Sequence, residues 1–136
     1  MKLYYAPGTI AAAVAIALEE TGLPHETALV DFSSAAQTKL DYLRINPKGR
    51  VPALDIGGAI LTETGAILDW LHTQAPQAGL IPAEPLTAAR VREAMYYFAS
   101  TMHVNHAHKR RGARWASREE SFADMAAKVP ETMTAS

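Results

Sequence analysis

Residues 45–54 read INPKGRVPAL, a turn rich in proline and glycine that leads into a second proline and a short β-prone run. A proline is tolerated at the start of a strand, and the bond before a proline is one of the few peptide bonds that adopt the cis form. The runs 51–55 and 59–61 flank Ile56-Gly57-Gly58, which predicts an antiparallel hairpin with a glycine turn. Residues 61–71 read LTETGAILDWL and predict a helix that leaves this hairpin.

The chain before this stretch alternates strand and helix signals. Residues 3–5 are a short β-prone run, and a helix with apolar residues at helical spacing follows, with Thr9 as a plausible N-cap and Gly22 as a stop. Residues 27–32 predict a second strand, and the polar stretch 33–45 predicts a loose, partly exposed helix. A strand, a helix and a second strand in succession usually imply a parallel pair with a right-handed crossover.

The chain after the hairpin is helical on both sides of a break. Residues 76–85 contain three prolines and one glycine, which is typical of a linker. Beyond it, residues 91–102 and 119–133 each carry an apolar helical face, the second preceded by a capping-box pattern at Ser117. The order predicts a thioredoxin-like α/β domain (βαβα-ββα) over residues 1–77, followed by an incomplete all-α domain over 86–136.

Composition narrows the class of protein. Hydrophobic residues make up 49% of the 136 residues and charged residues 20%, with a formal net charge of −1, which is typical of a globular chain and not of a nucleic-acid binder. No apolar run reaches the length of a membrane span, and the first residues lack the apolar core of a signal peptide, so we expect a cytoplasmic protein. The chain has no cysteine, so any thiol chemistry must use the sulfur of a substrate or cofactor.

Four segments together resemble the glutathione transferase family, most closely its bacterial beta class. They are residues 1–9 (MKLYYAPGT), 17–24 (ALEETGLP), 45–54 and 61–71. The last two, in this order and at this spacing, are the specific ones. The resemblance implies a thioredoxin-like glutathione domain followed by an all-helical domain, of which this chain holds about the first two helices. We expect either a truncated member or a partner that supplies the remaining helices.

The resemblance implies where glutathione binds. The bond Val51–Pro52 is cis in the family, which leaves the backbone groups of Val51 free to pair with the cysteinyl part of glutathione like an added strand. Glu63 would take the ammonium of the γ-glutamyl end, and Thr64 its carboxylate, at a helix N-terminus that favours anions. The alternatives are an ordinary strand-edge proline and an ordinary helix cap.

The sequence departs from the beta class where the thiol would lie. Members of this class usually carry a cysteine at the position of Ile10, whereas other classes hold the glutathione thiolate with serine or tyrosine. Thr9, or N–H groups near it, is the first candidate for this catalytic role, and Tyr5 is the second. One donor and a helix dipole lower the pKa of a thiol from its free value of about 8.5. The alternative is that Thr9 is only an N-cap.

Two further positions follow from the resemblance. Ser34 takes the place of a lysine that contacts the glycyl carboxylate in beta-class members, with Lys39 or Gln37 as possible substitutes. His103 falls where the beta class has a histidine that faces the active-site cleft, and a half-buried structural histidine is the alternative.

Neither metal nor nucleic acid is expected. The histidines after residue 102 have no acidic ligand near them, so they predict no metal site. The basic run 108–114 has no interleaved aromatic residues, so it is interpreted as a solvated helix end.

The sequence therefore favours a glutathione-binding transferase that activates the thiolate for attack on a small hydrophobic electrophile. Glutathione would be the co-substrate, and a homodimer is expected because the family is usually dimeric; no membrane partner is expected. Glutathione-dependent isomerisation is not separated from transfer. A non-catalytic glutathione- or protein-binding module, and a truncated fragment, remain the alternatives.

Overall fold

Four short strands form one mixed sheet in the computed structural model, which describes residues 1–136. The strands are β1 (Lys2–Tyr5), β2 (Glu26–Leu29), β3 (Ala53–Asp55) and β4 (Ile60–Thr62). Their order in the sheet is β2-β1-β3-β4, with β1 and β2 parallel and the other two pairs antiparallel. The predicted parallel pair and the predicted hairpin are both confirmed.

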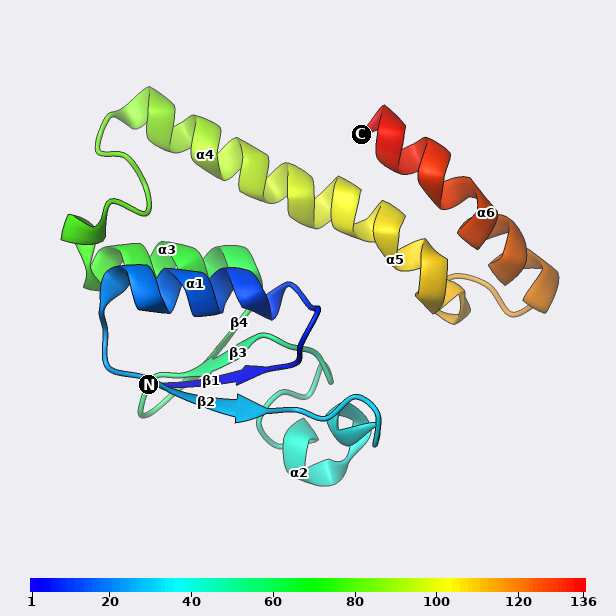
Figure 1. Cartoon of the computed structure of the whole chain (residues 1–136), viewed down its shortest axis with the longest axis horizontal. Helices are drawn as coiled ribbons and strands as arrows, with labels where there is room; N and C mark the ends of the chain where they lie inside the picture. The colour runs from blue at the N-terminus through cyan, green and yellow to red at the C-terminus, as the bar shows by residue number, and fades with distance from the viewer. The chain divides into compact units, whose positions relative to one another are not determined.

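Two helices cover one face of this sheet, and their packing forms the core of the first unit, Met1–Pro85. They are α1 (Ala11–Thr21) and α3 (Thr64–Gln74), which lie side by side above the strands (Figure 1). The fully buried larger hydrophobic side chains come from the sheet and from both helices: Leu3, Leu54, Val14, Leu18, Ile67 and Leu71. Burial of each stabilises the fold by about 1.5–3 kcal/mol, so this face holds the first unit together.

The segment between β2 and β3 differs from the prediction. The strand ends at Leu29 and not at residue 32, and the helix expected over residues 33–45 is two short pieces, a 3₁₀ turn (Ala36–Thr38) and α2 (Leu40–Leu43). Polar side chains here bond to nearby backbone: the Ser34 hydroxyl donates to the carbonyl oxygen of Asp31, and the Thr38 hydroxyl to that of Ala35. Such local bonds compete with a continuous helix.

The helical region agrees with the thioredoxin-like plus all-helical fold class. It forms the second unit, Leu86–Ser136. A long helical run consists of α4 (Pro85–Tyr97), a π-helical turn (Phe98–Met102) and α5 (His103–Arg111). After a 3₁₀ turn, α6 (Glu119–Ala135) returns along α5.

The start of α6 is the second difference from the prediction. The capping box expected at Ser117 is wrong, because Arg118 occupies the N-cap and makes no side-chain capping bond.

The pairing of α5 with α6 is fixed by packing and by polar contacts at the end of the chain. The amide of Asn105 donates to the hydroxyl of Ser136 at 2.7 Å. None of the helices combines the length and the apolar composition that crossing a bilayer requires.

Candidate functional site

The strand register gathers most of the predicted site residues at one end of the sheet. Tyr4 pairs with Ala53, and Ala53 pairs with Thr62 on its other side. One residue further along, Tyr5, which ends β1, therefore lies at the same end of the sheet as Pro52, directly before β3, and Glu63, directly after β4. Both α1 and α3 begin at this end of the sheet, because α1 follows β1 and α3 follows β4. Two helix N-termini, each carrying partial positive charge, thus meet at one end of the sheet, which favours an anionic ligand there.

The bond Val51–Pro52 is cis, as the sequence predicts. A buried network holds the residue before it: the carbonyl oxygen of Arg50 accepts one hydrogen bond from the amide of Asn46 and one from the hydroxyl of Tyr42, both at 2.7 Å. Asn46 is 1% exposed, and burial raises the pKa of the Tyr42 hydroxyl. Because both donors are buried in the fold, the backbone entering the cis bond is fixed in position.

The turn before the cis bond is also held from inside. The side-chain oxygen of Asn46 accepts from the backbone N–H of Lys48 at 3.1 Å, and the backbone N–H of Gly49 donates to the carbonyl oxygen of Asn46 at 2.9 Å. Gly49 has a φ of 60°, and a Cβ added to it would lie 2.9 Å from the backbone oxygen of Gln37. Only glycine fits this conformation and this close approach.

Glu63 and Thr64 lie where β4 passes into α3. Glu63 precedes the helix with a φ of 70°, an uncommon value for a residue other than glycine. No side chain caps the helix, and its first acceptor is the carbonyl oxygen of Glu63, which receives the N–H of Ile67 at 3.0 Å. The preceding N–H groups of the first turn are therefore available to a ligand.

Lys48 contacts Glu63 and Thr62, and the sequence alone did not indicate it as a site residue. Its Nζ lies 2.6 Å from Oε1 of Glu63 and donates to the hydroxyl of Thr62 at 3.1 Å. The lysine and glutamate side chains are 50% and 65% exposed, so the pair lies at the surface. The only sequence feature that could have indicated this contact is the presence of a lysine in the turn before the cis proline. The partner of that lysine, Glu63, lies 15 residues further along the chain.

Thr9 and Tyr5 lie at the edge where α1 begins. The hydroxyl of Thr9 donates to the carbonyl oxygen of Ala6 at 2.7 Å and accepts weakly from the N–H of Ala11 at 3.4 Å. The N-cap predicted at Thr9 is wrong by one residue: Ile10, 45% exposed, occupies that position and makes no side-chain capping bond. Tyr5 lies on the core side of β1, half-buried against the α1 and α3 side chains.

Ser34 lies in the loop that follows β2, at the same end of the sheet. Its neighbour Ser33 donates its hydroxyl to Oδ1 of Asp31 at 2.6 Å. The two serine hydroxyls and the Ser33 N–H hold the pKa of Asp31 below its usual value, with the Ser33 hydroxyl as the main cause. Of the two proposed substitutes, Lys39 is exposed, whereas Gln37 has a buried side-chain oxygen without a hydrogen-bond partner.

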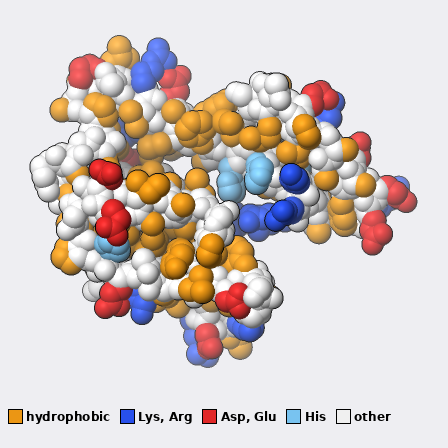
Figure 2. Space-filling view, in the orientation of Figure 1, with side chains coloured by type: hydrophobic (Ala, Val, Ile, Leu, Met, Phe, Trp, Pro, Cys, Tyr) orange, Lys and Arg blue, Asp and Glu red, His pale blue; other side chains and the backbone are white.

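His103 is exposed at the start of α5, directly after the π-helical turn. It belongs to the second unit, so its role toward glutathione stays a prediction. The basic run at the end of α5 forms a cluster of Lys, Arg and His side chains on that unit (Figure 2). The ring of His108 meets the ring of Trp115 edge to face, with the ring centroids 4.4 Å apart. No group of three or more histidine and acidic side chains is arranged to hold a metal ion.

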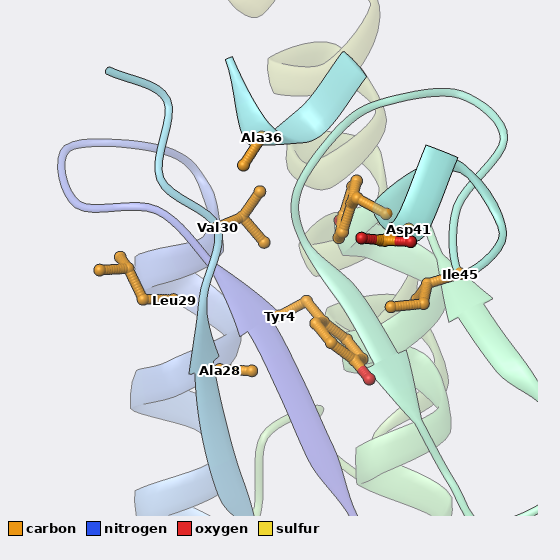
Figure 3. Close-up of a pocket in the computed structure, with 8 residues that line it drawn as sticks. Tyr4, Ala28, Leu29, Val30, Ala36, Asp41 and Ile45 are labelled. Atoms are coloured by element: carbon orange, nitrogen blue, oxygen red, sulfur yellow. The ribbon is translucent and has the colours of Figure 1, made fainter. Parts of the chain in front are cut away.

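A crevice of about 210 Å³ lies on the other face of the sheet. It is lined mainly by apolar side chains between the strands and the segment that contains α2, with the ring of Tyr4 below Asp41 (Figure 3). The rings of Tyr4 and Tyr42 meet edge to face at 6.0 Å in its wall. None of the residues predicted to bind glutathione lines this crevice.

Comparison with known proteins identifies the family. The glutathione S-transferase N-terminal domain family matches residues 1–73. The crystal structure of a glutathione transferase homologue from Sulfitobacter, with bound glutathione, superposes with a TM-score of 0.97 at 62% identity, over 98% of this chain and 65% of that chain. The chain belongs to the glutathione S-transferase family, and its fold is that of the family.

Two curated relatives of this chain are named for two different activities. Glutathione S-transferase GstA of Escherichia coli O157:H7 is 35% identical over 106 residues, which is 76% of this chain and 53% of the relative. Maleylacetoacetate isomerase of Rhizobium meliloti (strain 1021) is 38% identical over 90 residues, which is 66% of this chain and 42% of the relative. The chain thus spans about half the length of the curated relatives it matches.

Proposed function

We propose that the protein binds glutathione at the end of the sheet where β1 ends and β3 begins, and activates its thiol for attack on a small hydrophobic electrophile. The observation that carries the proposal is the register that aligns Tyr4, Ala53 and Thr62, because it brings the cis Val51–Pro52 bond and the start of α3 to the same edge. The glutathione bound to the Sulfitobacter homologue supports the choice of glutathione as the ligand.

Each part of glutathione has a partner in this proposal. The backbone N–H and C=O of Val51 pair with the cysteinyl residue in the manner of an added strand. Glu63 receives the ammonium of the γ-glutamyl end, and Thr64 with the first N–H groups of α3 receives its carboxylate. Ser34 and His103 are proposed for the rest of the ligand.

The thiol is placed at the N-terminus of α1. The dipole of this helix favours the thiolate over the thiol, and Thr9 turns its hydroxyl proton from Ala6 to the sulfur when glutathione binds. Tyr5 is the second candidate for this hydrogen bond. The thiolate then supplies its electron pair to an electrophilic carbon: a carbon–sulfur bond forms, and the leaving group departs or the adduct takes up a proton.

The proposed setting follows the family. A cytoplasmic homodimer, with the electrophile bound next to the glutathione sulfur, is the assembly we propose. Since relatives include maleylacetoacetate isomerase, addition of glutathione followed by its departure is the related reaction that this site would also support.

One observation favours a second candidate, a glutathione- or protein-binding module without turnover. Ile10 offers no hydrogen bond to sulfur, and the hydroxyl proton of Thr9 is already engaged with Ala6. Turnover of a generic aromatic electrophile separates the two functions. A transferase consumes the electrophile only when glutathione is present, and Thr9→Val slows it. A protein that binds glutathione without consuming the electrophile is a binding module.

A further inference from the structure

We propose that Lys48 recognises the α-carboxylate of the γ-glutamyl end of glutathione, beside Glu63 and the N-terminus of α3. This inference rests on the proposed glutathione site and adds a residue to it. It follows from the contact between Nζ of Lys48 and Oε1 of Glu63 at 2.6 Å, together with the shared contact to the hydroxyl of Thr62 at 3.1 Å.

The chemistry of the ligand end makes the pairing specific. The γ-glutamyl end of glutathione carries an ammonium and a carboxylate on the same carbon atom. A ligand whose ammonium reaches the carboxylate of Glu63 therefore brings its own carboxylate close to whatever already contacts Glu63. Lys48 is that group, so the four charges alternate in sign: lysine ammonium, glutamate carboxylate, ligand ammonium and ligand carboxylate. Without Lys48, the protein would offer the ligand carboxylate no positive side chain beside Glu63, and only Thr64 and the helix N–H groups would contact it.

The backbone of Lys48 is fixed, whereas its side chain is free to adjust. The side-chain oxygen of Asn46 receives the Lys48 N–H, and Asn46 itself is buried. The Lys48–Glu63 pair is half-exposed, and exposed ion pairs contribute little to stability. The protein therefore loses little stability when the Lys48 ammonium shifts from Glu63 and Thr62 to a position shared with the ligand.

The second unit offers a matched pair as a control. Lys128 and Glu131 form an ion pair at 2.7 Å with exposures of 59% and 69%, close to those of Lys48 and Glu63. Substitution of either lysine by methionine removes one charge from one exposed pair. Only Lys48→Met is expected to change glutathione binding.

The test is calorimetric titration of glutathione, and of its glycyl ethyl ester, into the wild type and the variants Lys48→Met, Lys48→Arg and Lys128→Met. We expect Lys48→Met to weaken both ligands about tenfold, since one charge-assisted contact is lost. Lys48→Arg is expected to retain most of the affinity, and Lys128→Met all of it. Melting temperatures of the variants check that each is folded.

Three results would overturn the proposal. Unchanged or tighter binding by Lys48→Met would make Lys48 a plain surface ion-pair partner of Glu63. Loss of the Lys48 dependence with the ethyl ester would assign Lys48 to the glycyl carboxylate. Absence of glutathione binding by the folded wild type would overturn the proposed function as well, and this outcome is distinct from the first two, in which the wild type binds.

Discussion

The buried amide of Asn46 donates to the carbonyl oxygen of Arg50 at 2.7 Å, one residue before the cis Val51–Pro52 bond. The same side chain accepts the N–H of Lys48. One residue thus holds both the backbone proposed to pair with the cysteinyl part of glutathione and the turn that carries the lysine proposed to meet its γ-glutamyl end.

Replacement of Asn46 by alanine is expected to lower the free energy of unfolding by about 1–3 kcal/mol, because it leaves buried polar groups without a partner. Glutathione binding should weaken as well, since the backbone around Val51 is released. Urea denaturation and calorimetric titration measure the two effects. The control is Asn105→Ala, which removes an amide that bonds to Ser136 in the second unit. Equal losses of glutathione affinity in both variants would contradict this role of Asn46.

Tyr42→Phe is expected to cost about 1 kcal/mol near neutral pH, through loss of the hydrogen bond to Arg50. The effect depends on pH because burial raises the pKa of Tyr42 in the folded protein. A raised folded-state pKa contributes stability that is present below the unfolded tyrosine pKa of about 10 and is lost as the pH rises through the folded value. The stability gap between wild type and Tyr42→Phe should therefore narrow above about pH 10. Urea denaturation over a pH series checks this, and a gap that widens would refute it.

Gly49→Ala and Gly57→Ala compare two glycines that both have a positive φ. A Cβ at Gly49 would lie 2.9 Å from the backbone oxygen of Gln37, whereas a Cβ at Gly57 meets nothing within 4 Å. We expect Gly57→Ala to cost about 1 kcal/mol from backbone strain alone, and Gly49→Ala at least about 1 kcal/mol more. Equal unfolding free energies for the two variants would show that the turn at Gly49 yields freely.

Thr9→Val tests the proposed role of the Thr9 hydroxyl. Loss of its hydrogen bond to the sulfur is expected to raise the pKa of the bound thiol by about one unit and to slow turnover about tenfold. Thr9→Ser keeps the hydroxyl and should resemble the wild type. The ultraviolet absorbance of the thiolate as a function of pH gives the pKa. A Thr9→Val protein with an unchanged thiol pKa would shift the role to Tyr5 or to the N–H groups of α1.

The sheet and its two covering helices could be predicted because local signals agree there. Apolar spacing marks α1 and α3, Gly22 ends α1 in a left-handed conformation, and the glycine pair at 57–58 turns the hairpin. The cis proline follows from the same motif. These features depend on neighbours in sequence.

The parts that sequence reasoning missed depend on individual side-chain contacts, two of them local and one between residues 15 positions apart. The segment over 33–45 breaks into two short helices because its polar side chains bond to local backbone. Lys48 and Glu63 meet only because the hairpin returns the chain to the same edge 15 residues later. The engagement of Thr9 with Ala6 is equally invisible in a pattern of residue types.

The most direct test of the glutathione site is titration of glutathione into the wild type and the variants Glu63→Gln and Glu131→Gln. Glu63→Gln removes the charge proposed to hold the γ-glutamyl ammonium and leaves the side-chain size unchanged. Glu131→Gln does the same at an ion pair in the second unit. We predict saturable binding by the wild type and by Glu131→Gln, and binding at least about tenfold weaker by Glu63→Gln. No saturable binding by the folded wild type, or equal affinity in all three proteins, would contradict the site described above.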